Sequence, residues 1–219
     1  MQFERIISFL QELNKNNNRE WFAENRAKYD DFRLLTVELT EHLLSFIKSF
    51  DANLSHIEPK QCMYRIYRDI RFSKDKTPYK THVGFFFSAR GRSGAFPGYY
   101  LHIEDGKSFV GGGIHVPPVD DLKNLRQEIY YNMEEFLDIF ESQQFSSFYK
   151  ELSDYGKLKT APRDYDIDYE HIDVLNNKSF VVSSAISNEL LFSEKGLDYV
   201  KNAFFALKPL IDFLSRVYD

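Results

Sequence analysis

A basic, aromatic segment stands out in an otherwise acidic chain. Between Lys60 and Arg92 there are nine lysines and arginines against two carboxylates, so this stretch carries a charge of +7 while the whole chain carries −5. Charge at this density either meets an anion or neutralises carboxylates of the protein itself. We call residues 65–80 the basic cassette. Its candidate ligand-binding residues are Arg65, Arg68, Arg71, Lys74, Lys76, Tyr79 and Lys80.

The cassette suits the recognition of phosphate or carboxylate groups. In a predicted strand over 62–72, side-chain alternation puts Arg65, Asp69 and Arg71 on one polar face and turns Arg68 toward the apolar face. Arginine binds carboxylate or phosphate through two parallel hydrogen bonds. The lysines of the following loop would extend the site, and its tyrosine would form an aromatic wall. We therefore predict that the cassette binds an anionic small molecule.

Two other interpretations stay open. In a hydrolase or nuclease-like enzyme acting on a phosphate ester, Asp69 or a histidine would act as acid or base. In a structural or interaction protein, Asp69 would instead pair with Arg65 or Arg71, and the remaining cations would meet carboxylates such as those of the acidic segment 164–173. Nucleic acid is a further candidate, because aromatic and basic residues alternate here, but the acidity of the whole chain argues against it.

Three histidines would form a metal site only if the fold brings them together. His82, His102 and His115 fall in or next to predicted strands, and Glu104 shares a strand face with His102. Imidazole and carboxylate groups are zinc ligands. Strand spacing does not show that they converge, and separate surface histidines are the commoner case. The sequence therefore predicts no metal site and no cofactor.

The glycine triplet and the single cysteine further limit the kinds of functional site that the chain can form. Gly111 to Gly113 stand in a predicted strand, where they indicate a bulge or a close backbone approach, with packing favoured over ligand binding. They form no dinucleotide fingerprint, because the third glycine position is occupied by Val116. Cys62 is the only cysteine, which excludes an internal disulfide. Its place on the apolar face predicts a buried, inert thiol.

The periodicity of apolar residues predicts the elements that hold these groups. Helical spacing over 2–13 and 18–50, with a kink or a break near 34–36, predicts a long helical N-terminus. After Pro59 the pattern changes to β-rich runs separated by turn residues. The predicted strands are 62–72, 82–90, 98–104, 107–114 and 179–187. The later predicted helices begin at Asp120 or Asp121, cover 132–142 and 144–154, and end with a C-terminal helix capped by Ser193.

This order of elements predicts an α+β fold. It has an antiparallel sheet of about four to five strands, with a meander core, flanked by helices. A length of 219 residues without a linker predicts a single domain over 1–219. The lack of an apolar run long enough for a signal peptide or a membrane span predicts no membrane partner. Together with the single cysteine, this favours a cytoplasmic location.

Three motifs resemble a known family. They are NNREWF at 17–22, RxYRDxRFSKDKxPYK at 65–80 and the glycines at 111–113. The chain resembles an uncharacterised family of bacterial and fungal proteins of about this size, classed as a domain of unknown function. The resemblance covers nearly the whole chain and implies a single-domain member. It implies no established activity, cofactor or catalytic residue.

Overall fold

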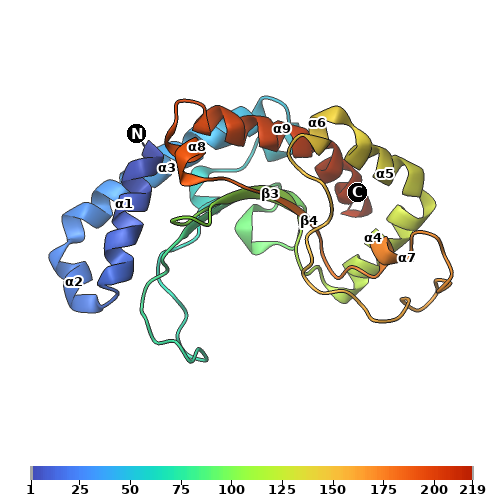
Figure 1. The fold of residues 1–219 in the computed structure, drawn as a ribbon, viewed down its shortest axis with the longest axis horizontal. Coiled ribbons are helices and arrows are strands. Elements are labelled where there is room, and N and C mark those ends of the chain that lie inside the picture. Colours follow the sequence, from blue (N-terminus) through green and yellow to red (C-terminus); the bar gives the residue numbers. More distant parts are fainter. Residues whose placement is uncertain (1, 219) are drawn as a thin grey trace.

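Helices arch over a four-stranded antiparallel sheet in the computed structural model, which describes residues 2–218 (Figure 1). The strands are β1 (Val83–Ser88), β2 (Gly98–Ile103), β3 (Phe109–Ile114) and β4 (Phe180–Ala185). They lie in the order β1-β2-β3-β4, and each neighbouring pair is antiparallel. The predicted α+β class with an antiparallel meander is therefore confirmed.

The N-terminal helices are α1 (Gln2–Lys15), α2 (Arg19–Glu24) and α3 (Arg26–Lys48). Asn18 caps α2, because its side chain accepts a hydrogen bond from the backbone N–H of Trp21 at 2.8 Å. Of the kink or break expected near 34–36, a break does not occur: α3 is continuous there, and the chain leaves helical geometry at Asn25 instead.

The remaining helices pack around the sheet. They are α4 (Val119–Tyr131), α5 (Met133–Glu141), α6 (Gln143–Ser146), α7 (Ile172–Leu175), α8 (Asn188–Phe192) and α9 (Gly196–Ser215). Short 3₁₀ turns lie at Ala52–Leu54, Pro59–Gln61, Gly91–Ser93 and Arg216–Tyr218. The helix predicted over 144–154 reduces to α6. The predicted Ser193 cap of the C-terminal helix is wrong, because α9 has Lys195 at its N-cap position and no side-chain cap. None of the described helices has the length and apolar character needed to cross a membrane.

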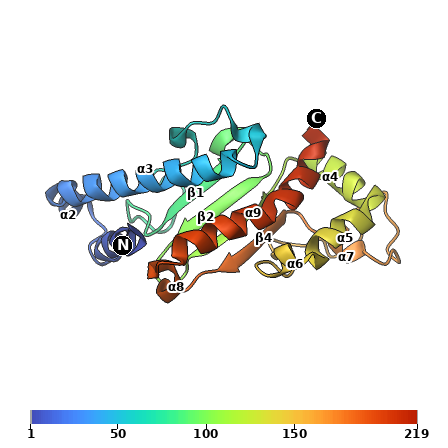
Figure 2. The ribbon, with the colours of Figure 1, turned by 90° about the horizontal axis from the view of Figure 1, so that it is seen from above.

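One face of the sheet packs against helices. The strand residues that point this way are buried: Val83, Phe85, Phe87, Tyr99, Leu101, Ile103, Val110, Ile114, Phe180 and Val182. Figure 2 shows α9 running across this face. A Cβ atom on Gly112 would come within 2.9 Å of Leu207 Cδ1, so α9 rests directly on the backbone of β3. Burial of these apolar side chains contributes hydrophobic stabilisation to the fold.

The opposite face of the sheet carries the residues of interest. Its side chains alternate with the buried set and include Phe86, Tyr100, His102, Phe109 and Ser183, which are half-buried or exposed. We call this the open face. In Figure 1, α9 lies above the sheet, and the open face looks toward the loops drawn below it.

The strand predicted over 62–72 is wrong. Isolated bridges join Met63 to Phe85 and Tyr67 to Tyr79, but no regular strand forms. Only the start of the segment lies along β1, and the rest folds back on residues 77–80. Residues 65–80 thus form an irregular arm that projects beyond the sheet (Figure 1). Because most of the arm has no core to pack against, side-chain alternation does not predict burial there.

Two residues show the failure of the alternation directly. Phe72, which strand alternation would place on the same apolar face as Cys62, is 95% exposed. Arg68, assigned to the same face, pairs with Asp75 inside the arm. Cys62 and Ile66 are buried as predicted, because they lie near the base of the arm, where it meets the sheet.

Candidate functional site

Two of the predicted cassette residues hold the arm together. The guanidinium of Arg68 donates hydrogen bonds to Asp75 and Thr77. Asp75 also accepts hydrogen bonds from the backbone N–H of Thr77 at 2.9 Å and from its hydroxyl at 2.8 Å. The Thr77 backbone N–H, followed by Arg68, lowers the pKa of Asp75 to about 2. Lys76 donates to the carbonyl of Ile70 at 2.9 Å.

Arg71 pairs with Asp69 at the exposed part of the arm. Its Nε donates to Oδ1 at 2.9 Å and its Nη2 to Oδ2 at 2.6 Å, a bidentate geometry. This contact lowers the pKa of Asp69 to about 2, so that Asp69 carries no proton to donate at neutral pH. The pairing is the one that the structural interpretation of the cassette expected.

Tyr79 and Lys74 lie away from any shared site. Tyr79 is 5% exposed and stacks on Phe22 of α2, with ring centroids 4.0 Å apart and an interplanar angle of 12°. Its backbone is held by Asn17, whose side chain accepts from Tyr79 N at 3.1 Å and donates to Tyr79 O at 3.0 Å. Lys74 is exposed near the tip of the arm. Tyr79 therefore anchors the arm to the N-terminal helices.

The other two predicted residues, Arg65 and Lys80, border a cavity of about 180 Å³ at the base of the arm. Lys80 Nζ lies 5.6 Å from the centroid of the Tyr64 ring. Burial, followed by the charge of Arg65, lowers the pKa of Lys80. Within residues 2–218, no ion pair involves either cation. The remaining lining residues are Tyr64, His82, Gly84 and Tyr100.

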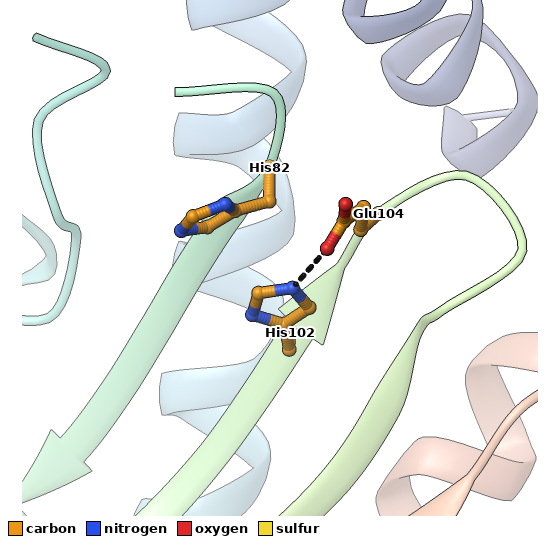
Figure 3. A group of neighbouring side chains, drawn as sticks. All are labelled: His82, His102 and Glu104. Carbon is orange, nitrogen blue, oxygen red and sulfur yellow. Dashed lines mark hydrogen bonds and ion pairs between the residues drawn. The ribbon is translucent and has the colours of Figure 1, made fainter. Parts of the chain in front are cut away.

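A cluster of three potential metal ligands adjoins this cavity (Figure 3). His82 precedes β1, His102 lies on β2 and Glu104 follows β2. One ligand atom from each residue lies within 4.8 Å of the others. The rings of His82 and His102 stack with centroids 4.6 Å apart, and His102 Nε2 lies 3.2 Å from Glu104 Oε2. The convergence that the sequence left open is thus present for these residues.

Sheet register produces the cluster. In the pairing of β1 with β2, Val83 lies opposite Ile103 and Gly84 opposite His102. Continuing this register by one pair places His82 across from Glu104, with His102 on the same face two residues away. Gly84 leaves room for the Tyr100 ring, because a Cβ atom there would lie 2.6 Å from the Tyr100 hydroxyl.

The immediate surroundings set the protonation and orientation of the cluster. Burial, followed by the charge of His102, lowers the pKa of His82 to about 4, so His82 is neutral at pH 7. The Tyr100 hydroxyl lies 3.2 Å from His102 Nδ1. Lys107 Nζ lies 3.6 Å from Glu104 Oε1. His102 Nε2 and Glu104 Oε2 therefore face one another, while the other polar atom of each residue has a separate neighbour.

A larger cavity of about 450 Å³ covers the middle of the open face. Its floor includes Gly111 and Gly113, which approach β4 so closely that a Cβ atom would lie 2.2 Å from Val182 O or 2.0 Å from Phe180 O. The close backbone approach predicted for the glycines is confirmed. The aromatic lining residues are Tyr64, Phe86, Phe96, Tyr100, Phe109 and Tyr155, and Arg92 contributes to the lining. Tyr64 and Tyr100 border both cavities.

His115 lies outside the metal-ligand cluster and borders the larger cavity, whereas the acidic segment 164–173 lies apart from both. The His115 ring packs edge-on against Tyr155 with centroids 5.0 Å apart. Tyr165 and Tyr169 of the acidic segment pack on Tyr130 of α4. Figure 1 and Figure 2 place that segment at the opposite end of the molecule from the arm. It therefore does not neutralise the cassette.

Cys62 has no role in this chemistry. Its side chain is fully buried, and burial raises the pKa of its thiol to about 12. A thiol in this setting is a poor nucleophile, as the sequence predicted.

Comparison with known proteins identifies a family without adding an activity. No curated protein and no solved structure matches the chain. The sequence model of the family described as conserved hypothetical protein (DUF2461) matches residues 5–213. The match spans nearly the whole chain, as the resemblance implied, and the protein belongs to this family.

Proposed function

We propose that the protein binds a small anionic ligand in the cavity at the base of the arm. The observation that carries this proposal is that Arg65 and Lys80 both border the cavity and form no ion pair within the described part of the chain. Neighbouring cations repel, and partial burial adds a desolvation cost for Lys80. A phosphate or carboxylate group would offset both costs through charge-assisted hydrogen bonds.

The proposed binding set is narrower than the seven residues of the sequence prediction. The side chains of Arg68, Arg71, Lys76 and Tyr79 are engaged within the protein, and Lys74 is exposed near the tip of the arm. We assign charge recognition to Arg65 and Lys80.

The lining of the adjoining larger cavity indicates the shape and polarity of the rest of the ligand. This cavity is lined mainly by aromatic rings and glycine backbone, and it shares Tyr64 and Tyr100 with the small cavity. A ligand with an anionic head and a planar, partly apolar body would match both parts. A small organic phosphate or carboxylate fits this description better than a nucleic acid strand. The cytoplasmic location expected from the sequence is part of this proposal, and fractionation of cells checks it.

The test is thermal denaturation with a panel of anions, in buffer containing a chelator. The panel contains inorganic phosphate, and it pairs phenyl phosphate with phenol and nucleoside monophosphates with their nucleosides. A ligand that binds only the native state stabilises it by about 2.7 kcal/mol at one hundred times Kd. We expect anions to raise the Tm and the uncharged counterparts to leave it unchanged.

Variants locate the binding. Lys80→Ala and Arg65→Ala should each weaken binding by at least about tenfold, the value of one charge-assisted hydrogen bond. Lys74→Ala is the matched control, because it removes the same charge from the same arm but outside both cavities. Equal losses in all three variants, or no loss in Lys80→Ala, would contradict the proposal.

A further inference from the structure

We propose that His82, His102 and Glu104 bind one divalent transition-metal ion, with zinc as the best match. Two imidazoles and one carboxylate form a donor set that suits zinc and its neighbours in the first transition row. This inference stands on the cluster alone and does not depend on anion binding by Arg65 and Lys80.

The separations between the ligand atoms are close to those of a metal-bound state. Ligands about 2.1 Å from a tetrahedral zinc ion lie about 3.4 Å from each other. The separation of 3.2 Å between His102 Nε2 and Glu104 Oε2 is near this value, and the three ligand atoms lie within 4.8 Å of one another. Because the His82 and His102 rings are stacked, closing the set also requires a movement of the His82 ring that turns one of its nitrogens toward the ion. His82 lies at the end of a loop, where such a movement needs no change in the sheet (Figure 3).

The ring nitrogens of His82 are available to a metal ion. Neither of its ring nitrogens has a hydrogen bond to another described residue, although the ring is half-buried against His102. A metal ion at the cluster would take one of these nitrogens as a ligand.

The neighbours of the cluster would hold the ligands in place. With His102 Nε2 on the metal, the proton lies on Nδ1, which is 3.2 Å from the Tyr100 hydroxyl and could donate to it. Lys107 lies on the Oε1 side of Glu104, which leaves Oε2 for the metal. Such contacts fix the ring tautomer and the ligand orientation in metal sites.

Charge and coordination number favour an open site. Glu104 offsets part of the ion's charge, but Lys80 and Arg65 border the same cavity as His82 and oppose binding of a cation. Three protein ligands leave a fourth position free, the arrangement found in catalytic zinc sites. A water molecule or an anion oxygen would fill that position, and an anion there would also offset the two cations.

The test measures metal binding to the full chain directly. The protein is stripped with chelator, dialysed into phosphate-free buffer and titrated calorimetrically with Zn²⁺, Co²⁺, Ni²⁺ and Mn²⁺. We expect one Zn²⁺ per chain, a raised Tm, and visible d–d absorption from bound Co²⁺. His82→Ala and His102→Ala should weaken Zn²⁺ binding by more than about 100-fold, and Tyr100→Phe by about tenfold.

Control variants distinguish this site from nonspecific binding of Zn²⁺ to other histidines. His115→Ala removes another histidine of the sheet region, one that lies outside the cluster, and should bind Zn²⁺ as the unmodified protein does. If an alanine variant fails to fold by circular dichroism, His82→Asn and Glu104→Gln replace it. No stoichiometric binding to the unmodified protein would overturn the proposal. Equal binding by the His82 and His115 variants would overturn it as well.

Discussion

A single buried hydrogen bond ties the sheet to the end of the N-terminal helices. The Tyr99 hydroxyl donates to Asp51 Oδ2 at 2.9 Å, and both residues are at most 1% exposed. Removing the donor leaves part of a buried carboxylate without its partner, which costs more than an exposed hydrogen bond does. The sequence did not single out either residue, because only the tertiary fold brings positions 48 residues apart into contact.

Replacing Tyr99 by phenylalanine tests this bond. We expect Tyr99→Phe to lower the free energy of unfolding by about 1.5 to 3 kcal/mol, the usual range for a hydrogen bond to a charged group. Urea denaturation measures the change. Tyr131→Phe removes the hydroxyl of a residue that is 72% exposed and should change the stability by less than about 0.5 kcal/mol. Similar effects of the two variants would contradict the role given to Asp51.

The arm should respond to acid through Asp75. Its pKa lies at about 2, below the ordinary 3.8, because Thr77 and Arg68 stabilise the ionised form. A lowered pKa means that the contribution to stability is complete above the ordinary pKa and is lost as the pH falls through the native value. The amide resonance of Thr77 should therefore hold its position down to about pH 4 and shift with a midpoint near pH 2.

Two variants give this titration its controls. Asp75→Asn should abolish the pH-dependent shift of Thr77. Arg68→Ala should move the midpoint upward, because it removes one of the groups that stabilise the carboxylate. A midpoint near pH 4 in the unmodified protein would show that Thr77 and Arg68 do not stabilise the ionised form of Asp75.

At the scale of elements, the packing of helix α9 requires a position without a side chain on strand β3. A Cβ atom on Gly112 would lie 2.6 Å from the Gly98 carbonyl oxygen and 2.9 Å from Leu207 Cδ1. Backbone atoms cannot move aside as a flexible side chain does. We expect Gly112→Ala to lower the free energy of unfolding by about 1 to 3 kcal/mol, the usual cost of overpacking a core.

Gly106 provides the comparison for Gly112. It has a φ of +68°, and a Cβ atom there would meet nothing within 4 Å. Asparagine tolerates this backbone conformation better than most residues. Gly106→Asn should therefore change the stability by less than about 0.5 kcal/mol. If denaturation shows equal losses for both variants, close contact with α9 is not what requires glycine at position 112.

Some elements were predictable from sequence and others were not. The strands predicted at 98–104 and 107–114 match β2 and β3 closely, because alternation and the Asp105-Gly106 turn are local signals. The 62–72 strand failed because alternation in sequence carries no information about whether a neighbouring strand is available. The segment bonds to β1 only near its start and then pairs with residues 78–80.

At the scale of the whole molecule, one buried core connects the N-terminal helices to the sheet. It includes Phe3 of α1, Leu43 of α3, Leu101 of β2 and Leu207 of α9. Helix α1 packs against α3 and α8, and α3 packs against α9. A shared core of this kind predicts that the chain unfolds as one cooperative unit.

The single tryptophan makes this prediction easy to check. Trp21 lies on α2, at the far end of the N-terminal helices from the sheet. Its fluorescence and the far-ultraviolet circular dichroism should give coincident urea transitions if residues 1–219 form a single domain. A fluorescence transition at lower urea would show that α1 to α3 unfold separately.

The sequence by itself determined the α+β class, the main helices, the positions of strands β1 to β4, the buried thiol of Cys62 and the resemblance to the family. These rest on periodicity, turn residues and motifs, which act over a few neighbouring residues. The sequence also located the basic cassette, but it could not divide it into cations engaged within the arm and cations that border a cavity.

Tertiary structure alone decided which side chains meet. The register of β1 against β2 brought His82, His102 and Glu104 together and left His115 elsewhere. Folding of the arm engaged Arg68 and Arg71 within the protein and left Arg65 and Lys80 at a cavity. The physical reason is that a shift of one residue in strand pairing would change every cross-strand neighbour without changing local preference, so that only packing of the whole chain fixes the pairing.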